Sequence, residues 1–231
     1  MKSQLYVPET TKRYLKSEIS DYIEIYCQKL LPVFKDIEND ADKYTKDLFD
    51  NAMSQPACGD SFDPASIAET APDEGIDHYL YLKLGKYNLT ATWHATLYQL
   101  WEQQLRWFLF REMSHVYKNK FETFCTNLSE IKEKFKLHNV DIENFSCWPQ
   151  INELSLLCNV IKHGDGRSAK KLRKIKPALF KQEDGTDHME IFKTTLLEET
   201  LNINEMTLQN YRGALLSFWD EIPERNYSDE L

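Results

Sequence analysis

The stretch from Ile76 to Lys118 carries the strongest helical periodicity in the chain, and it limits what this sequence can fold into. Its apolar residues recur at intervals of three and four, which places them on one broad face of a helix. They are Leu97, Leu100, Trp101, Leu105, Phe108 and Leu109. So long an apolar face must be covered by other elements, so the segment predicts a helical bundle. Gly85 is expected to divide the stretch into a short helix and a long one.

Other segments repeat this spacing and predict further helices. Seven glycines and eight prolines in 231 residues are too few for an all-β protein rich in tight turns. The expected helices cover residues 14–53 with a break at Pro32, 119–136, 150–163, a short basic segment with Ser168 as N-cap, and 204–219 with Asn204 as N-cap. Residues 188–203 mix β-branched and apolar residues without helical period, which predicts a small β-hairpin. The predicted fold class is mainly α, an antiparallel helical bundle.

Residues 54–75 collect three prolines, two glycines and several small polar residues, which predicts a loop. This loop suggests a division of the chain into three parts. Residues 1–75 form an N-terminal helix and loop extension, residues 76–222 a helical domain, and residues 223–231 a C-terminal tail.

The five cysteines are scattered and include no CxxC pair, which favours reduced thiols over a disulfide framework or a zinc site. The N-terminus has no apolar signal region, and no apolar run approaches transmembrane length. The sequence therefore predicts a cytoplasmic protein without membrane contact. It lacks the P-loop, GxSxG, HExxH and dinucleotide glycine patterns, so we expect neither a metal nor a cofactor.

Asn159 and His163 stand four residues apart at the end of a predicted helix, just before Gly164. Residues at this spacing share one helix face. Helix carbonyls in the last turn favour the protonated form of a histidine, which suits His163 to acid–base catalysis near neutral pH. The spacing fits equally well a histidine that only caps its own helix end. Gly164 is expected to supply the left-handed residue that ends the helix.

The stretch CNVIKHGDG, residues 158–166, resembles the signature helix of the HEPN superfamily. In its ribonuclease members that helix carries an arginine, a polar residue that is often asparagine, three variable residues and a histidine. Asn159 and His163 match the last two of these positions, whereas Cys158 stands at the arginine position. The stretch ATWHATLYQLWEQQLRWFLF resembles the preceding long helix of such domains. The resemblance covers roughly residues 76–222 and is shared with uncharacterised bacterial proteins that have a KHGDG core.

This resemblance implies a symmetric homodimer paired through the long helix and the signature helix. HEPN ribonucleases cleave RNA without a metal, with arginine and histidine side chains of both protomers facing the scissile phosphate. Arginine binds phosphate oxygens bidentately and stabilises developing charge, which the shorter, uncharged Cys158 side chain does not do. We therefore expect a non-catalytic HEPN-like module that binds a partner protein or RNA in a bacterial stress, toxin–antitoxin or phage-defence setting. The alternative is a metal-independent endoribonuclease that uses His163 and Asn159 at a dimer interface.

A catalytic version of this chain needs a substitute for the missing arginine. His94, Tyr98, Glu102 and Arg106 share one face of the preceding helix. If that face meets the signature helix, Glu102 or His94 would orient His163, and Arg106 would bind phosphate. Arg167, which follows the Gly-Asp-Gly turn, is the other candidate, because it could fold back towards His163. Alternatively, Glu102 and Arg106 form an ordinary surface ion pair.

A basic run begins beside His163. Residues 162–181 contain eight lysines and arginines against one acid, Asp165, in a chain of net charge −9. This is the only stretch suited to neutralising phosphates. The predicted RNA-binding residues are Arg167, Lys170, Lys171, Arg173 and Lys174. An acidic partner protein fits the same run, and so does a merely solvated face.

Overall fold

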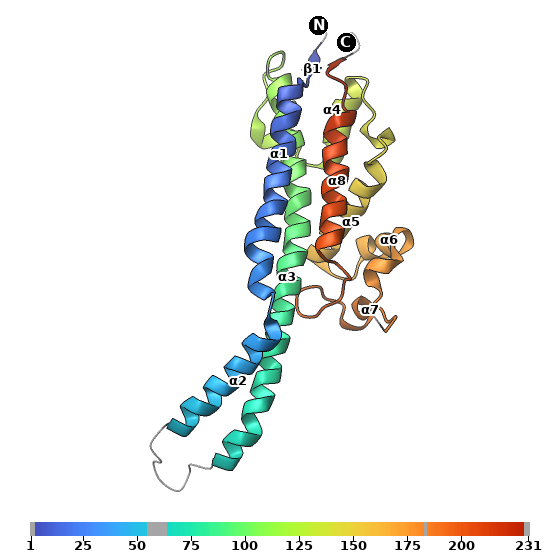
Figure 1. The fold of residues 1–231 in the computed structure, drawn as a ribbon. Helices are drawn as coiled ribbons and strands as arrows, with labels where there is room; N and C mark the ends of the chain where they lie inside the picture. Colours follow the sequence, from blue (N-terminus) through green and yellow to red (C-terminus); the bar gives the residue numbers. More distant parts are fainter. Residues whose placement is uncertain (1–2, 55–63, 183, 229–231) are drawn as a thin grey trace.

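The longest element is α3, Pro64–Met113, which extends from one end of the molecule to the other (Figure 1). The structure is a computed structural model that describes residues 3–54, 64–182 and 184–228. The protein is mainly α-helical, as predicted. In the described ranges, no helix combines the length and apolar character needed to cross a membrane.

Long helices run side by side with the C-terminal half of α3 and form a bundle (Figure 1). The bundle contains α1 (Glu9–Ile25), α4 (Leu128–Leu137), α5 (Trp148–His163) and α8 (Glu205–Glu221). The short helices α6 (Arg167–Ile175) and α7 (His188–Phe192) lie beside the lower end of α5. At the opposite end, β1 (Gln4–Tyr6) pairs antiparallel with β2 (Arg225–Tyr227), with Leu5 opposite Asn226. This pairing brings the two ends of the chain together.

Aromatic side chains fill the centre of the bundle. The Trp101 ring of α3 meets the Phe218 ring of α8 edge to face, with centroids 5.0 Å apart, and both side chains are fully buried. Ile19 and Ile23 of α1 belong to the same continuous core. The N-terminal helix, which the sequence treats as an extension, therefore packs as part of the bundle.

Side chains close several helix ends. Asn204 caps α8 through a reciprocal capping box with Thr207, which confirms the predicted N-cap. The Glu221 carboxylate accepts hydrogen bonds from the backbone NH groups of Ser146 (2.7 Å) and Cys147 (3.2 Å), directly before α5. The buried Lys12 ammonium of α1 donates to the Ile222 carbonyl just beyond α8. Each bond satisfies a backbone group that the helix itself leaves unpaired, and each ties two helices together.

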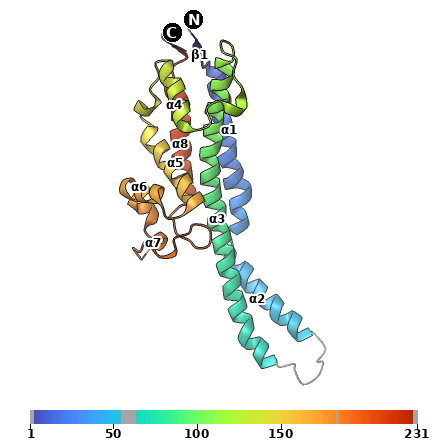
Figure 2. The ribbon, with the colours of Figure 1, turned by 180° about the vertical axis from the view of Figure 1, so that it is seen from behind.

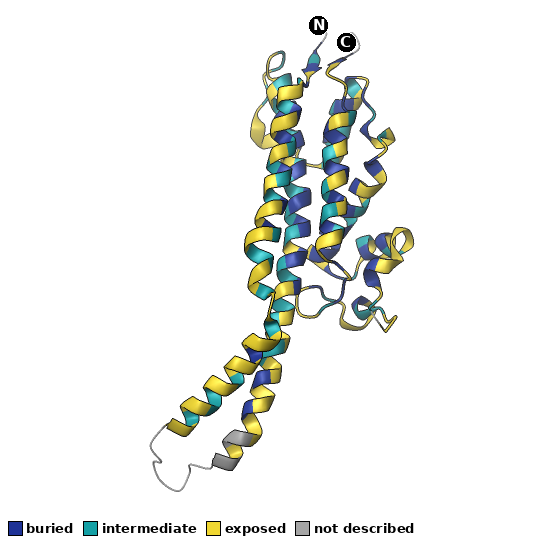
Figure 3. Ribbon diagram, in the orientation of Figure 1, coloured by how far each residue is buried: buried dark blue, intermediate teal, exposed yellow. Residues whose placement is uncertain are grey.

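A two-helix arm projects from the bundle (Figure 1). We use "the arm" for α2 (Ile37–Ser54) together with residues 64–82 of α3. A π-helical turn (Tyr26–Leu30) and a 3-10 turn (Leu31–Phe34) lie between α1 and α2, which confirms the break expected at Pro32. The helices of the arm approach closely at Gly75, where an added Cβ would collide with the Thr45 hydroxyl. Apart from a few small residues, most of the arm is exposed (Figure 3).

Two predictions about α3 are wrong. Residues 64–75, predicted as a loop, are the first turns of α3, while residues 55–63, with Cys58, lie outside the described residues. The prolines and glycines suggested a loop, but packing against α2 holds the segment helical. Gly85 does not divide the helix, because α3 is continuous there and packs beside Phe34.

The segment 119–136 contains a shorter helix than predicted. Residues Phe121–Thr123 form a 3-10 turn, and α4 begins only at Leu128. The Asn127 side chain fixes this start by accepting a hydrogen bond of 3.1 Å from the Glu130 backbone NH. Similarly, α6 begins at Arg167 with Gly166 as its N-cap, so Ser168 is not the cap.

The β-hairpin predicted near residues 188–203 is wrong. The segment forms α7 followed by irregular chain, and Asp187 caps α7 by accepting from the Glu190 backbone NH. The Thr195 hydroxyl donates to the Ile161 carbonyl of α5 at 2.7 Å. The Thr200 hydroxyl donates to the Thr194 carbonyl at 2.9 Å. The β-branched residues thus hold a loop through side-chain hydrogen bonds rather than pairing as strands. Of the predicted C-terminal tail, Arg225–Tyr227 forms β2 and residues 229–231 lie outside the described residues.

Candidate functional site

The last turn of α5 presents Asn159 and His163 together. Both side chains are exposed, and their spacing places them on one helix face. The Asn159 amide donates to the Ser155 carbonyl of the preceding turn at 3.1 Å. Gly164 ends the helix, as predicted, with a positive φ of 68°, but its ψ of −150° lies outside the left-handed helical region that the sequence suggested. A side chain at Gly164 would lie 2.6 Å from the Lys193 carbonyl oxygen, so the helix end fits tightly against the chain after α7.

Cys158, at the position where the resemblance calls for arginine, points away from this exposed face. Only 2% of its surface is exposed, and its thiol lies 3.6 Å from the Ala95 carbonyl of α3. Burial raises the pKa of the thiol, which keeps it neutral. The position therefore supplies neither a positive charge nor a thiolate.

Glu102 is half-buried on α3 and accepts a hydrogen bond of 3.3 Å from the Tyr98 hydroxyl. Burial raises the pKa of Glu102, against the opposing effects of the Tyr98 hydrogen bond and the positive charge of Lys162. Glu102 thus acts electrostatically with Lys162 of α5. It forms no ion pair with Arg106 among the residues that the structure describes.

His94 and Arg106 do not join His163. The His94 ring is fully buried, its Nδ1 bonds to the Thr90 carbonyl at 2.8 Å, and its Nε2 lies 2.9 Å from Thr207 Oγ1. Burial lowers the pKa of His94 to about 4. The Arg106 guanidinium donates to the Phe121 and Phe124 carbonyls at 2.5 and 2.8 Å, and so anchors the loop after α3. The polar face predicted on α3 therefore splits into side chains with separate structural partners.

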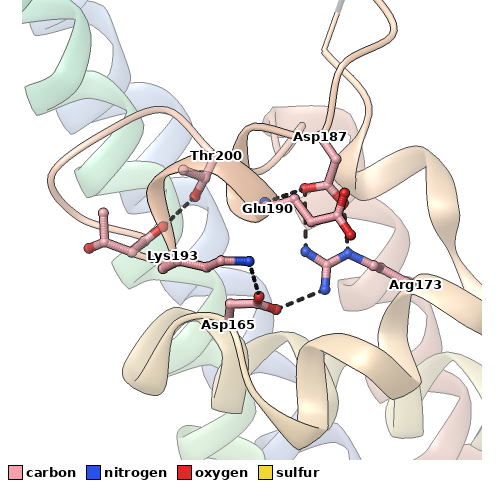
Figure 4. A network of polar contacts seen from close by, with 7 residues as sticks. Asp165, Arg173, Asp187, Glu190, Lys193 and Thr200 are labelled. Atoms are coloured by element: carbon pink, nitrogen blue, oxygen red, sulfur yellow. Dashed lines mark hydrogen bonds and ion pairs between the residues drawn. The ribbon is translucent and has the colours of Figure 1, made fainter.

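An ion network lies between α6, α7 and the turn after α5 (Figure 4). Arg173 donates to Asp187 at 2.6 Å and to Asp165 at 2.8 Å, while Lys193 donates to Asp165 at 3.0 Å. The guanidinium also lies over the Phe180 ring, 4.6 Å from its centroid. Arg173, predicted as an RNA-binding residue, is therefore committed to holding α6 in place.

The remaining cations of α6 form an exposed surface. We define the basic face as Arg167, Lys170, Lys171 and Lys174, all of which are exposed. None of the four forms an ion pair with any described residue. The sequence did not predict the network around Arg173, because two of its members, Asp187 and Lys193, are distant from Asp165 and Arg173 in the chain. Its one local signal was Asp165, the single acid in the basic run.

A separate cavity of about 1050 Å³ lies where the arm joins the bundle. Its walls include Tyr26, Lys35, Lys83, Tyr87 and Glu205. Several of its polar groups are already paired within the chain: the Tyr26 hydroxyl lies 2.8 Å from Thr90 Oγ1. Neither Asn159 nor His163 lines this cavity. Among the described residues, no group of three or more histidine, cysteine, aspartate or glutamate side chains is placed to hold a metal ion.

Comparison with protein-family models, curated proteins and solved structures finds no match to this chain. The likeness to HEPN proteins therefore depends on the residues of the signature helix and the helix before it.

Proposed function

We propose that this protein is a non-cleaving, HEPN-like module that binds RNA through the basic face. The observation that carries the proposal is the row of four exposed cations without ion-pair partners in the described chain. In a protein of net charge −9, such a row attracts polyanions only locally. Lysines and arginines that neutralise phosphates release counterions, which supplies most of the affinity of sequence-independent nucleic-acid binding.

The neighbouring end of α5 adds hydrogen-bonding groups to this surface. Asn159 and His163 are exposed within a few residues of Arg167, where α5 turns into α6. Amide and imidazole groups can bond to base edges and ribose hydroxyls, which an acidic protein surface does not offer in the same way. This combination favours RNA over an acidic partner protein.

The surroundings of His163 favour binding without cleavage. Transition-state stabilisation at a phosphate needs a cation aimed at the developing charge. Cys158 is buried and neutral, and Arg106 is bonded to the Phe121 and Phe124 carbonyls. Arg173 is held between two carboxylates. None of these three side chains is free to take the missing arginine's role. The exposed Arg167, which follows the turn after α5 and has no ion-pair partner among the described residues, is the candidate that the cleavage assay below tests.

Replacing Lys170, Lys171 and Lys174 with glutamine is expected to weaken RNA binding by about ten- to a hundredfold at 0.1 M salt. Each lost phosphate contact lowers the slope of log K against log salt by about 0.7 for a single strand. Fluorescence anisotropy with a labelled 20-nucleotide RNA, titrated at several salt concentrations, measures both quantities. The slope should fall by roughly 2 in the variant.

The matched control replaces Lys29, Lys118 and Lys120, which are exposed elsewhere, with glutamine. It changes the net charge equally and should retain the wild-type slope. An equal loss in both variants would show a non-specific charge effect and contradict the proposal. So would a wild-type protein that fails to bind any RNA at low salt.

The shared exposed face of Asn159 and His163 supports one competing function, a metal-independent ribonuclease. Incubating total RNA and transfer RNA with the purified protein in chelator tests it. We expect no cleavage. Cleavage that disappears in His163→Ala, at unchanged mass and helicity, would replace the binding proposal with catalysis.

A further inference from the structure

The arm is strongly acidic. Within α2 and residues 64–82 of α3, nine carboxylates stand against two lysines, and all nine are exposed. They are Glu38, Asp40, Asp42, Asp47, Asp50, Glu69, Asp73, Glu74 and Asp77. Much of the negative charge of the chain is thus concentrated on an element that leaves the bundle.

One face of the arm also exposes apolar side chains. Glu69, Asp73, Ile76 and Leu80 follow one another on α3 at intervals of four, three and four, which places them along a single helix face. Ile76 is 58% exposed and Leu80 is 52% exposed. A helix normally turns such an apolar stripe towards a partner. Here α2 contacts a different side of α3, where the buried Gly75 lies against Thr45 of α2.

The helix α6 has a matching surface of opposite charge. Arg167, Lys171 and Lys174 follow one another at intervals of four and three. Ile175, which is 49% exposed, adjoins them. Each surface therefore combines like charges with exposed aliphatic side chains, two on the arm and one on α6, and the two sets of charges have opposite signs.

These two surfaces do not meet within one chain. In Figure 1 the arm leads away from the side of the bundle that carries α6 and α7, and the rear view in Figure 2 agrees. We propose that the acidic arm of one copy of this chain docks on the basic face of a second copy. A two-fold arrangement makes the contact twice, because each copy supplies one arm and one basic face.

This interface differs from the pairing of long and signature helices that the HEPN resemblance implies. It also does not depend on RNA binding. However, the arm and RNA would use the same cations, so the partner's arm would compete with RNA for the basic face. Opposite charges at such a contact mainly set specificity and association rate, and salt weakens them.

A charge-swap experiment with the full-length chain tests this inference. The arm variant carries Glu69→Lys and Asp73→Lys, and the face variant carries Lys171→Glu and Lys174→Glu. In homodimers of either variant the contact surfaces repel. In a mixture of the two, the reversed pair of charges on one arm meets the reversed pair on the other copy's face, and the unchanged arm meets the unchanged face, so both contacts are restored.

Sedimentation velocity without RNA, at about 50 mM and about 500 mM salt, gives the mass of each species. We expect a wild-type dimer at low salt that dissociates at high salt, monomers for each variant alone, and a heterodimer for the mixture. The control variant Asp21→Lys with Glu24→Lys reverses two exposed charges on α1 and should dimerise like the wild type. Circular dichroism checks that every variant keeps its helicity.

A monomeric wild type at low salt overturns the inference. So does a dimer that survives both reversed variants, which would point to the long-helix pairing instead. The RNA measurement separates this proposal from the proposed function. If the arm competes, the arm variant should bind RNA more tightly than the wild type, whereas the face variant should bind it more weakly. RNA binding lost in the face variant without any dimer would leave the proposed function standing alone.

Discussion

Lowering the pH from 7 to 4 is expected to remove about 3 kcal/mol from the free energy of unfolding through one side chain, His94. Burial lowers the pKa of this histidine from an ordinary 6.5 to about 4. The unfolded chain therefore takes up the proton first as the pH falls. The contribution of His94 to the free energy of unfolding is fully present above pH 6.5 and decreases as the pH falls to the folded pKa near 4.

The structure around His94 shows why the ring stays neutral. Its Nδ1 bonds to the Thr90 carbonyl, and Thr207 lies against Nε2. The Tyr211 ring meets the His94 ring edge to face, with centroids 5.8 Å apart. Burial, aided by the hydrogen bond to Glu153, raises the pKa of Tyr211, so this phenol is uncharged across the same range. No neighbouring anion compensates for a proton on His94 within the described contacts.

Guanidinium unfolding at pH 7, 6, 5 and 4 measures this loss. His94→Gln removes the titrating group. Between pH 7 and pH 4 its free energy of unfolding should therefore fall by about 3 kcal/mol less than that of the wild type, even if the variant is less stable at pH 7. His163→Gln changes an exposed histidine and controls for the substitution itself. Identical pH profiles for His94→Gln and the wild type would contradict the assignment.

The fold features that the sequence predicted are those with local signals. The helix α8 has its cap residue Asn204 three positions before Thr207, and α5 ends at a glycine with positive φ. The features that it did not predict depend on contacts between distant segments. Residues 64–75 look like a loop in isolation but pack on α2. The chain around Thr195 looks strand-like, yet its hydroxyl bonds to α5.

The same distinction applies to the candidate site. Helical spacing correctly grouped Asn159 with His163, because spacing determines which residues share a face. It did not reveal what each face meets. His94 and Arg106 share a face of α3, but one is sealed in the core and the other bonds to the loop after the helix. Arg173 and Lys174 are adjacent cations in one basic run, and among the described residues only the first has carboxylate partners.

Arg173 and Lys174 should therefore differ strongly in their contribution to stability. Replacing Arg173 with methionine is expected to lower the free energy of unfolding by about 3 kcal/mol, because the two carboxylates it joins lose their shared counter-charge. The Arg173 side chain is only 21% exposed, so water replaces it poorly. Burial alone would raise the pKa of Asp165, but the hydrogen bonds from Arg173 and Lys193 outweigh it and hold that pKa below its ordinary value. This part of the stability is present above the unfolded pKa of aspartate and disappears as the pH falls through the lower folded value.

Lys174→Met is the matched control, since it removes an adjacent but exposed cation. It should change stability by less than about 0.5 kcal/mol, and it should weaken RNA binding if the basic face binds phosphate. Arg173→Lys should recover only part of the stability, because an ammonium cannot join two carboxylates with the forked geometry of a guanidinium. Urea unfolding at pH 7 measures all three variants, and RNA anisotropy separates their roles. Equal destabilisation by Arg173→Met and Lys174→Met would show that the network does not hold α6 against α7. If Arg173→Met mainly lowers stability and Lys174→Met mainly weakens RNA binding, then Arg173 supports the structure of this surface and Lys174 binds the RNA.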